Sequence, residues 1–361
     1  MVSRERILIA MSGGVDSSVA AAWLAQQGYD VVGVTLHLWD YPDDGSVRGR
    51  CCAPEDQHDA RRVADHLGIA HYAFDRRELF AKEVVEPFVD SYLAGSTPSP
   101  CVACNRSVKM AELFGLADRL GAKKIATGHY ARTVQKGDRI ELHRAADAGK
   151  DQSYFLHMLS QAQLGRIMFP LGDATKAEVR KSALDLGLPG ASKGESQELC
   201  FVPTGRYDAF VDERAGQRAR PGAIVDETGR VVGAHQGVHR FTVGQRKGLG
   251  VALGSPAYVV GIDAETGEVR LGGSEELFHS VARLRDAQFM DDVALPVRAA
   301  VKVRYRHEGA QGTVRRDESG VFVEFDTPVR AIARGQVAVA YDGDRVLGGG
   351  TIDHAMNGAS A

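Results

Sequence analysis

Residues 7–18 read ILIAMSGGVDSS, and this stretch decides the fold class of the amino-terminal part of the chain. Its apolar half, residues 7–11, predicts a buried strand, and residues 15–27 have the composition of a helix. Glycines between a strand and a helix let the backbone approach a phosphate, and the first amides of the helix point at that anion. The stretch therefore predicts a phosphate-binding loop, although a helix cap after a tight turn would use the same residue types.

The charged residue of this loop indicates how a phosphate would be bound. Asp16 would repel a bare phosphate, so its carboxylate predicts a Mg²⁺ ion that bridges a pyrophosphate group. The hydroxyls of Ser12 and Ser17 add hydrogen-bond donors. The loop lacks the terminal lysine of a Walker motif and the glycine spacing of a dinucleotide site. We therefore expect a nucleotide site of another kind.

The rest of the chain predicts three domains. Short apolar runs alternate with helical patterns over residues 1–205, which predicts an α/β domain with a parallel sheet and crossover helices. Within it, Thr175 and Glu178 form a capping box for a helix that reaches about Leu186. Residues 206–278 are rich in glycine turns and predict a small β-rich central domain. The strand-like runs of residues 279–361 predict a compact β-barrel.

Composition narrows the class of protein. The chain has 361 residues, 44% of them hydrophobic, so it is long enough to bury more than one core. No apolar run reaches the length of a membrane span, and the amino terminus predicts a strand rather than a signal peptide. Five cysteines, an odd number, predict intracellular thiols and a cytoplasmic location. A net charge of −3 means that any RNA site must be a local patch.

Residues 97–105, TPSPCVACN, place two thiols beside a proline-stiffened loop. We expect a helix to begin near Lys109, which would put Cys104 close to a helix amino terminus. A thiol pKa falls there and the thiolate fraction rises, so Cys104 is a candidate nucleophile. Cys200, distant in sequence, lies at the carboxyl end of the same predicted domain. Buried structural thiols or a structural zinc site remain alternatives.

Six motifs occur along the chain in an order that resembles one known family. The S-G-G-x-D-S loop by itself resembles the pyrophosphate loop of the ATP pyrophosphatases, which have an adenine nucleotide alpha hydrolase-like fold and cleave ATP between the α and β phosphates. The other five are PSPCVACN at 98–105, TGHYA at 127–131, GKDQSYF at 149–155, CF at 200–201 and GQRKGLG at 244–250. The combination spans nearly the whole chain and resembles the bacterial tRNA-specific 2-thiouridylases.

This resemblance implies an activity and roles for individual residues. It implies ATP-dependent thiolation of C2 of the wobble uridine in tRNAs for Lys, Glu and Gln, with sulfur from a donor protein or hydrosulfide. Cys104 would be the nucleophile, and Cys200 would carry the persulfide. The implied ATP site consists of Ala10, Met11, Ser12, Gly13, Gly14, Val15, Asp16, Ser17, Leu36 and Gly128. The implied contacts with tRNA and the target base are Ser99, Pro100, Cys101, His129, Lys150, Asp151, Gln152, Arg304, Tyr305 and Gln336.

One position departs from the better-known form of the family, which has an aspartate three residues before the nucleophile. Here that residue is Cys101, and with Cys104 and Cys200 it gives three thiolates. This set resembles the branch of tRNA thiolases that hold a [4Fe-4S] cluster on three cysteines. The alternative is a persulfide relay that ends in a disulfide between Cys104 and Cys200. Adjacent side chains rarely reach one metal together, so Cys51 and Cys52 are interpreted mainly as structural.

Two basic patches are candidates for RNA contact. Residues 301–306, VKVRYR, alternate in character, so a strand there would place Lys302, Arg304 and Arg306 on one face. An ordinary solvated strand face is the simpler interpretation of that pattern. Arg246 and Lys247, on a glycine-flanked loop, form the second patch.

Two other functions are compatible with parts of this pattern. An amidating ligase of the ATP pyrophosphatase superfamily would need an ammonia source, and we expect none because the sequence begins directly at the phosphate loop. A non-catalytic metal-binding RNA module built around the cysteines would leave the phosphate loop unexplained. The thiolase hypothesis accounts for both features.

Overall fold

The computed structural model describes residues 4–40, 54–194, 199–202, 205–252 and 254–357. The chain forms two compact units, each made of segments that are separate in the sequence. The first unit comprises Met1–Val85, Cys101–Gly205 and Asp344–Val346, and the second comprises Glu86–Pro100, Arg206–Gly343 and Leu347–Ala361. No helix in the described ranges combines the length and the apolar character needed to cross a lipid bilayer.

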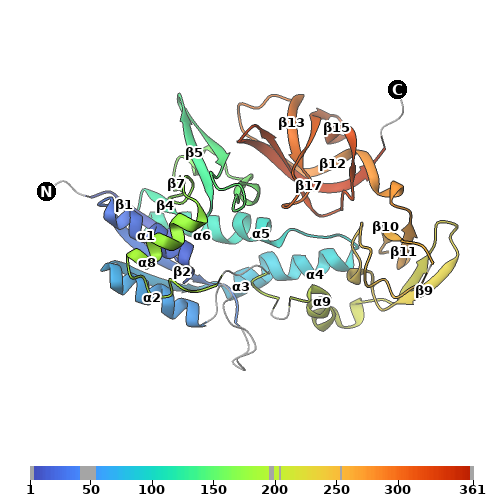
Figure 1. Ribbon diagram of the computed structural model, residues 1–361, viewed down its shortest axis with the longest axis horizontal. Coiled ribbons are helices and arrows are strands. Elements are labelled where there is room, and N and C mark those ends of the chain that lie inside the picture. The colour runs from blue at the N-terminus through green and yellow to red at the C-terminus, as the bar shows by residue number, and fades with distance from the viewer. Residues whose placement is uncertain (1–3, 41–53, 195–198, 203–204, 253, 358–361) are drawn as a thin grey trace. The chain divides into compact units, whose positions relative to one another are not determined.

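A five-stranded parallel sheet forms the centre of the first unit (Figure 1). Its strands are β1 (Arg6–Ala10), β2 (Asp30–His37), β3 (Ala70–Asp75), β4 (Lys124–Ala126) and β7 (Ile167–Met168), in the order β3-β2-β1-β4-β7. Every pairing between neighbours is parallel. The central strand β1 has a fully buried apolar centre, as expected when helices cover both faces of a parallel sheet. The predicted parallel-sheet α/β domain is confirmed.

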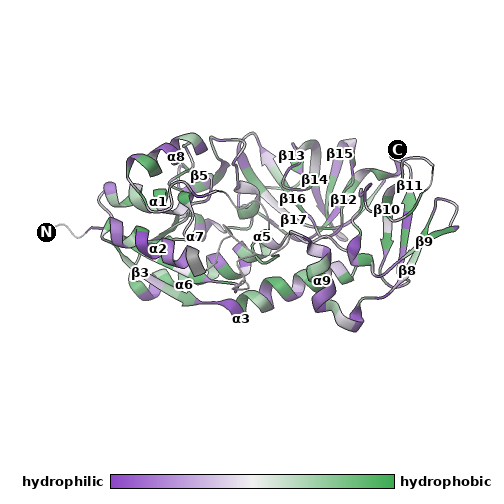
Figure 2. Cartoon of the chain, turned by 60° about the horizontal axis from the view of Figure 1, so that its bottom comes forward, coloured by the Kyte–Doolittle hydropathy of each residue, from purple (hydrophilic) through white to green (hydrophobic). Residues whose placement is uncertain are grey.

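Helices connect these strands. The longer ones in the first unit are α1 (Val15–Gln26), α2 (Pro54–Leu67), α6 (Ala111–Leu120) and α8 (Lys176–Asp185). The shorter ones are α3 (Arg77–Phe80), η1 (Ala81–Val85), α5 (Pro100–Ala103), η2 (Cys104–Met110), η3 (Ser153–Leu156) and α7 (Gln161–Leu164). α1 packs against α2 and α8, and α8 carries hydrophilic and hydrophobic residues (Figure 2). The predicted capping box at the start of α8 is confirmed, because the Thr175 side chain accepts from the Glu178 amide.

A hairpin that the sequence patterns did not predict follows β4. It consists of β5 (Ala131–Lys136) and β6 (Arg139–Arg144), joined by a turn in which Gly137 has a φ of +57°. Its β6 strand pairs with Arg345, so a short segment from the end of the chain belongs to the first unit. The first unit is therefore completed by residues distant in sequence.

The second unit contains a small sheet and a barrel. The sheet has the strands β8 (Gly222–Val225), β9 (Val231–His235), β10 (Tyr258–Asp263) and β11 (Glu268–Gly272), in the order β10-β11-β8-β9. Helices α4 (Glu86–Leu93) and α9 (Tyr207–Ala215) pack together in the same unit. The Tyr92 and Tyr207 rings stack with centroids 4.5 Å apart, and Phe88 meets Phe210 edge to face.

The carboxyl-terminal strands close into a six-stranded barrel. They are β12 (Phe278–Phe289), β13 (Val297–Lys302), β14 (Ala310–Asp317), β15 (Gly320–Arg330), β16 (Val337–Asp342) and β17 (Arg345–Met356). The order β12-β15-β14-β13-β16-β17 is closed by a further pairing of β12 with β17. Small and branched apolar side chains, including Val301, Val314, Val323 and Ile352, fill the interior. The predicted β-barrel is confirmed.

One predicted strand is shorter than expected, and the basic stripe inferred from it is wrong. β13 ends at Lys302, and residues 303–306 form a bend and a turn. The turn is closed by the His307 amide, which donates to the Arg304 carbonyl at 3.0 Å. Lys302, Arg304 and Arg306 therefore do not share the face of one strand.

Candidate active site

The phosphate loop lies where the order of the parallel sheet reverses. β1 is flanked by β2 on one side and β4 on the other, so the loops after β1 and β4 leave the same edge of the sheet and diverge there. Such switch points are where open α/β sheets bind ligands. A side chain on Gly128, which follows β4, would place its Cβ 2.9 Å from the Ser17 amide nitrogen. Only glycine at residue 128 permits the segment after β4 to lie this close to the first turn of α1.

The loop itself is fixed by its own polar groups. The Ser17 hydroxyl accepts from the Ser12 amide and donates to the Gly14 carbonyl, each at 3.1 Å. Gly13 has a φ of +75°, and a Cβ at this position would lie 2.1 Å from the backbone oxygen of Asp56 at the start of α2. The loop conformation therefore requires glycine at residue 13 both for its dihedral angle and for the space beside it.

Asp16, the expected Mg²⁺ partner, is held by two side chains that the sequence patterns did not identify. Lys176 Nζ donates to its two carboxylate oxygens at 2.7 and 2.8 Å, and the Tyr130 hydroxyl donates to Oδ1 at 2.7 Å. The Lys176 side chain is only 12% exposed. The capping box at Thr175 predicts that Lys176 lies in the first turn of α8, but only the fold shows that this turn faces Asp16.

The remaining residues of the implied ATP site lie on β1, β2 and the start of α1. Ala10 ends β1, Val15 begins α1 and Leu36 lies near the end of β2. The Met11 amide donates to the Val34 carbonyl at 2.8 Å, which extends the pairing of β1 with β2 into the loop. Ala10 and Leu36 are half-buried positions along this edge.

The T-G-H-Y-A and G-K-D-Q-S-Y-F motifs contact each other inside the first unit. The Tyr130 amide donates to Gln152 Oε1 at 3.0 Å, and the Gln152 amide donates to the Tyr130 carbonyl at 2.8 Å. Asp151 is 6% exposed and accepts from the Ser153 amide and hydroxyl. In this structure Asp151 and Gln152 therefore hold the loop together, whereas half-buried Lys150 precedes them at the surface.

His129 is a neutral imidazole at ordinary pH. Burial lowers its pKa to about 3, and the positive charge of Lys109 acts in the same direction. Its Nδ1 lies 2.8 Å from the Thr127 hydroxyl. A histidine of this kind can exchange hydrogen bonds with RNA but does not offer it a positive charge.

The helix that carries the cysteine pair begins earlier than expected. α5 starts at Pro100 and continues through η2 and α6, so the predicted start near Lys109 is wrong. Cys101 consequently lies in the first helical turn and is exposed, and Cys104 lies one turn further on and is 6% exposed. The first turn of the helix therefore contains Cys101, and Cys104 lies beyond it. The local π-helical hydrogen bonding that begins at Cys104 is a form often found at functional sites.

Cys200 lies in a half-buried position next to an aromatic cluster of the first unit. Phe201 packs its ring against Phe80, with centroids 5.6 Å apart, and against Trp39 at 6.2 Å. Phe80 ends α3, and α3 also contacts η2, the segment that begins with Cys104. The segments that carry the two thiols thus share α3 as a neighbour.

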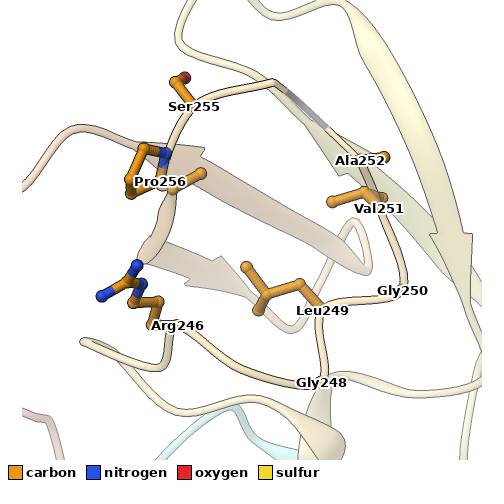
Figure 3. A pocket seen from close by; sticks show the side chains of 9 residues that line it. Arg246, Gly248, Leu249, Gly250, Val251, Ala252, Ser255 and Pro256 are labelled. Carbon is orange, nitrogen blue, oxygen red and sulfur yellow. The ribbon is translucent and has the colours of Figure 1, made fainter.

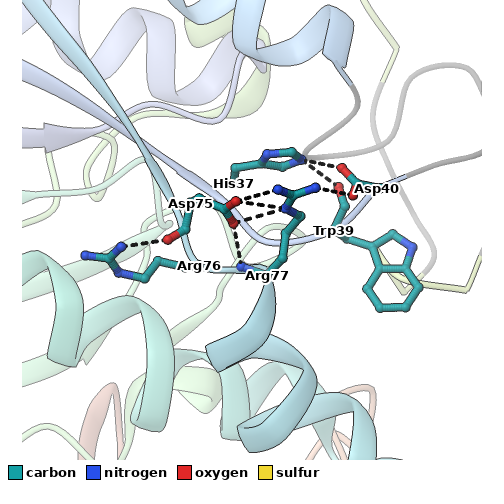
Figure 4. A network of polar contacts seen from close by, with 6 residues as sticks. All are labelled: His37, Trp39, Asp40, Asp75, Arg76 and Arg77. Carbon is teal, nitrogen blue, oxygen red and sulfur yellow. Dashed lines mark hydrogen bonds and ion pairs between the residues drawn. The ribbon is translucent and has the colours of Figure 1, made fainter.

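A polar network at the ends of β2 and β3 fixes the backbone next to Trp39 (Figure 4). Arg77 donates to both carboxylate oxygens of Asp75, at 3.0 and 3.1 Å, and to Asp40. These hydrogen bonds hold the pKa of Asp75 well below its ordinary value. His37 lies 2.9 Å from Asp40 and 3.2 Å from the Trp39 carbonyl. The network ties the end of β2 to the end of β3 and positions Trp39 beside Phe201.

The three described cysteines do not fit an iron–sulfur cluster in this arrangement. Within the described ranges, no group of three or more His, Cys, Asp or Glu side chains is placed to hold a metal ion. Cys101, Cys104 and Cys200 therefore do not form the expected three-thiolate site. Cys51 and Cys52 lie outside the described residues.

Gln336, an implied tRNA contact, instead binds the segment in front of Pro100 within the second unit. Its side-chain amide donates to the carbonyls of Thr97 and Pro98 at 3.0 and 3.3 Å. The Thr97 amide also donates to the Arg334 carbonyl at 2.8 Å. Gln336 thus holds the backbone that leads to Ser99 and Pro100.

The other implied tRNA contacts of the second unit lie in the turn after β13. Arg304 is exposed, and its guanidinium donates to the Arg330 carbonyl at a long 3.4 Å. Tyr305 is half-buried, with the Lys302 ammonium 5.7 Å from its ring centroid. Both residues are accessible at this turn.

Sequence models of three families match successive parts of the chain. The tRNA methyl transferase HUP domain matches residues 5–204, the tRNA methyl transferase PRC-barrel domain matches residues 208–273, and the aminomethyltransferase beta-barrel domain matches residues 280–352. The first of these models alone covers more than half of the chain.

Curated relatives match over almost their full length. The tRNA-specific 2-thiouridylase MnmA of Sorangium cellulosum is 62% identical over 99% of this chain and 95% of that protein. The protein of the same name from Geobacter metallireducens is 47% identical over 98% of each chain. Among solved structures, a 4-thiouridine synthetase in complex with RNA and ATP aligns at 16% identity over 59% of this chain and 50% of that chain, with a TM-score of 0.35. That structural similarity is too low to bear on function.

Proposed function

Because the chain belongs to the tRNA-specific 2-thiouridylase family, we propose that it uses ATP to replace the C2 oxygen of the wobble uridine of tRNA with sulfur. One observation in the structure carries the proposal. A pyrophosphate-type loop lies at the switch point of the sheet, and the segments of two cysteines distant in sequence pack against one helix of the same unit. The chemistry needs both an activating nucleotide and a sulfur-handling pair.

ATP is needed because the uracil C2 carbonyl is a poor electrophile. Adenylation of its oxygen releases pyrophosphate and converts that oxygen into part of AMP, which is a good leaving group. Backbone amides around Gly13 and Gly14 and the amino terminus of α1 suit the ATP phosphates. Mg²⁺, when bound, would neutralise phosphate charge, and Asp16 would be its carboxylate ligand.

We favour the persulfide relay, in which sulfur is transferred to the base in two steps. The terminal sulfur of a Cys200 persulfide bonds to C2, and AMP leaves with the original oxygen. The Cys104 thiolate then attacks Cys200 Sγ, so the sulfur–sulfur bond breaks and its electron pair stays on the sulfur attached to the base. A Cys104–Cys200 disulfide remains, and an external dithiol reduces it before the next cycle.

The RNA side of the proposal extends to the whole chain. The target base leaves the anticodon stack and lies against residues 99–101. Residues 1–205 carry catalysis, and residues 206–278 and 279–361 hold the tRNA, with tRNAs for Lys, Glu and Gln as substrates. A donor protein supplies the persulfide sulfur. Thiols that must remain reduced between cycles suit the cytoplasm.

The test is an assay with ATP, tRNA and a sulfur donor, followed by nucleoside analysis of the tRNA. The proposal predicts 2-thiouridine together with AMP and pyrophosphate. An amidating ligase would give no thionucleoside, and a non-catalytic RNA module would give no AMP. Cys104→Ser and Cys200→Ser should each abolish 2-thiouridine, while Cys101→Asp should retain it. Turnover by Cys104→Ser would contradict the assigned role of that thiol.

The cluster alternative is tested separately by iron and acid-labile sulfide analysis after oxygen-free purification. The relay predicts no stoichiometric iron in the wild type and none in Cys101→Asp. Iron that is stoichiometric in the wild type and lost in Cys101→Asp would replace the relay with cluster chemistry.

A further inference from the structure

The G-Q-R-K-G-L-G loop of the second unit is firmly fixed to the small sheet. The Gly244 amide donates to the Val259 carbonyl at 2.8 Å, and the Val259 amide donates to the Gln245 carbonyl at 2.9 Å, so the loop is tied to β10. The Gln245 side chain accepts from the Thr242 amide and donates to the Lys247 carbonyl, each at 3.0 Å. One amide side chain therefore bridges both ends of the turn.

The conformation of this loop directs its basic residues outward. Gly248 and Gly250 have φ values of +73° and +72°, which favour glycine. Between them Leu249 is 8% exposed and packs into the core of the small sheet. Arg246 and Lys247, which precede this anchor, are both exposed. The loop is thus a pre-organised support for two cations.

These two cations differ from two arginines of the small sheet, Arg230 and Arg270. Arg230 is paired with Asp226 at 3.1 Å, and Arg270 is paired with Glu276 at 3.1 Å. Across the part of the chain that the structure describes, no carboxylate forms an ion pair with Arg246 or with Lys247. Their charge is therefore available to an external anion.

Arg246 also borders a pocket of about 510 Å³ (Figure 3). The wall exposes polar and apolar surface in nearly equal measure. Besides Arg246 it is formed by Gly248, Leu249, Gly250, Val251, Ala252, Ser255, Pro256 and Ala257. The volume lies within the range of small-molecule sites, which is about 300–1,000 Å³. A pocket that offers both apolar and polar surface and has a guanidinium at its rim suits a nucleotide, which has a flat apolar base face and an anionic phosphate.

We propose that this pocket binds one unstacked nucleotide of the tRNA, at a site separate from the one that modifies the target base. The phosphate contacts Arg246 and Lys247, and the base or ribose lies against Leu249 and Pro256. The proposal deepens the proposed function, because it assumes that tRNA is the substrate. It adds a contact that the sulfur chemistry does not require and that serves affinity rather than the chemical step.

The test measures tRNA binding by fluorescence anisotropy over a series of salt concentrations, with Arg246→Gln, Lys247→Gln and the double variant. Each phosphate contact that is lost should make the slope of log K against log salt less negative by about 1, and should weaken binding by roughly 3- to 10-fold. The KM for ATP should not change. Arg230→Gln is the matched control, because its charge is already neutralised by Asp226. It should leave both slope and affinity as in the wild type.

A second pair of variants tests the pocket itself. Ser255→Asp introduces a carboxylate at the pocket wall, whereas Ser255→Asn has the same size without the charge. We expect only Ser255→Asp to weaken tRNA binding. Unchanged slopes in all Arg246 and Lys247 variants of an enzyme that still thiolates tRNA would overturn this inference alone. A wild type that neither binds nor thiolates tRNA would overturn the proposed function and the inference with it.

Discussion

Lys176 donates to both carboxylate oxygens of Asp16, so the acidic residue of the phosphate loop is ion-paired to the first turn of α8. The backbone of Lys176 is itself held, because its amide donates to Asp147 at 2.9 Å. A carboxylate beside an ATP triphosphate would otherwise repel it. If ATP and Mg²⁺ occupy the loop as proposed, Asp16 would hold the metal ion and the released Lys176 ammonium would contact a phosphate oxygen.

Lys176→Met should therefore weaken ATP binding. Without the ammonium, Asp16 keeps only the neutral Tyr130 hydroxyl, and one charge-assisted contact with phosphate is lost, which corresponds to about a tenfold rise in the KM for ATP. Steady-state AMP formation at varied ATP measures it. Lys181→Met is the control, because Lys181 is on the same helix but pairs with Asp185 in solvent. An unchanged KM in Lys176→Met would exclude this contact between Lys176 and phosphate.

Gly13→Ala should disrupt the phosphate loop, because alanine there is unfavourable both in its φ angle and in the space that its Cβ would need. Its Cβ would clash with the Asp56 backbone oxygen, and the loop or α2 would have to move. Gly137→Ala is the comparison, because Gly137 also has a positive φ but has open space beside it. We expect Gly137→Ala to cost about 1–2 kcal/mol of stability with AMP formation retained, and Gly13→Ala to abolish AMP formation. Urea unfolding and the AMP assay distinguish the two effects.

Lys193→Met should separate sulfur transfer from ATP use. Lys193 pairs with Asp56 and Asp59 of α2, and it lies seven residues before Cys200. Loss of its charge removes both of these ion pairs with α2, one of them to the buried Asp56. We expect roughly tenfold less 2-thiouridine per AMP formed, which corresponds to a rise of about 1.4 kcal/mol in the activation free energy of sulfur transfer. Lys193→Arg should restore the ratio, and equal losses of both products would contradict a positioning role.

Acid should destabilise the first unit through its buried histidines. His157 is 2% exposed, its pKa is lowered by burial to about 4, and its Nδ1 lies 2.9 Å from the Tyr154 carbonyl. The unfolded chain binds this proton near pH 6.5, so stability is complete above that pH and is lost as the pH falls towards 4. His157→Asn keeps a donor but does not titrate, and it should reduce the slope of stability against pH by at most about 1.4 kcal/mol per pH unit. Urea unfolding between pH 4.5 and 7.5, at roughly unit intervals, measures the slope. Equal slopes in the wild type and His157→Asn would contradict the role given to His157. His58→Asn is the control, because His58 is exposed.

Local patterns predicted the elements whose signals are contained in one stretch of sequence. The strand before residue 11, the helix after residue 14 and the capping box at Thr175 are of this kind. The pairing of Lys176 with Asp16 could not be predicted, because it joins residues 160 positions apart through the arrangement of α1 and α8. The predicted strand around β13 is too long, because the alternation of apolar and basic residues continues through Arg306. In the structure, a hydrogen bond from the His307 amide to the Arg304 carbonyl closes a turn there. The predicted helix start near Lys109 lies after the observed start at Pro100. The prediction treats the prolines as loop residues, although proline suits a first helical turn.

The exchange of segments between the two compact units limits how this chain can be dissected. Residues 86–100 belong to the second unit, although residues of the first unit flank them in the sequence. Residues 344–346 belong to the first unit, although residues of the second unit flank them. A fragment that ends at residue 205 would expose Phe88 and Tyr92, which pack on α9, and would lack the strand that pairs with β6. Neither half is an autonomous module, so truncations and domain swaps at the linear boundary would yield misfolded protein rather than separable activities.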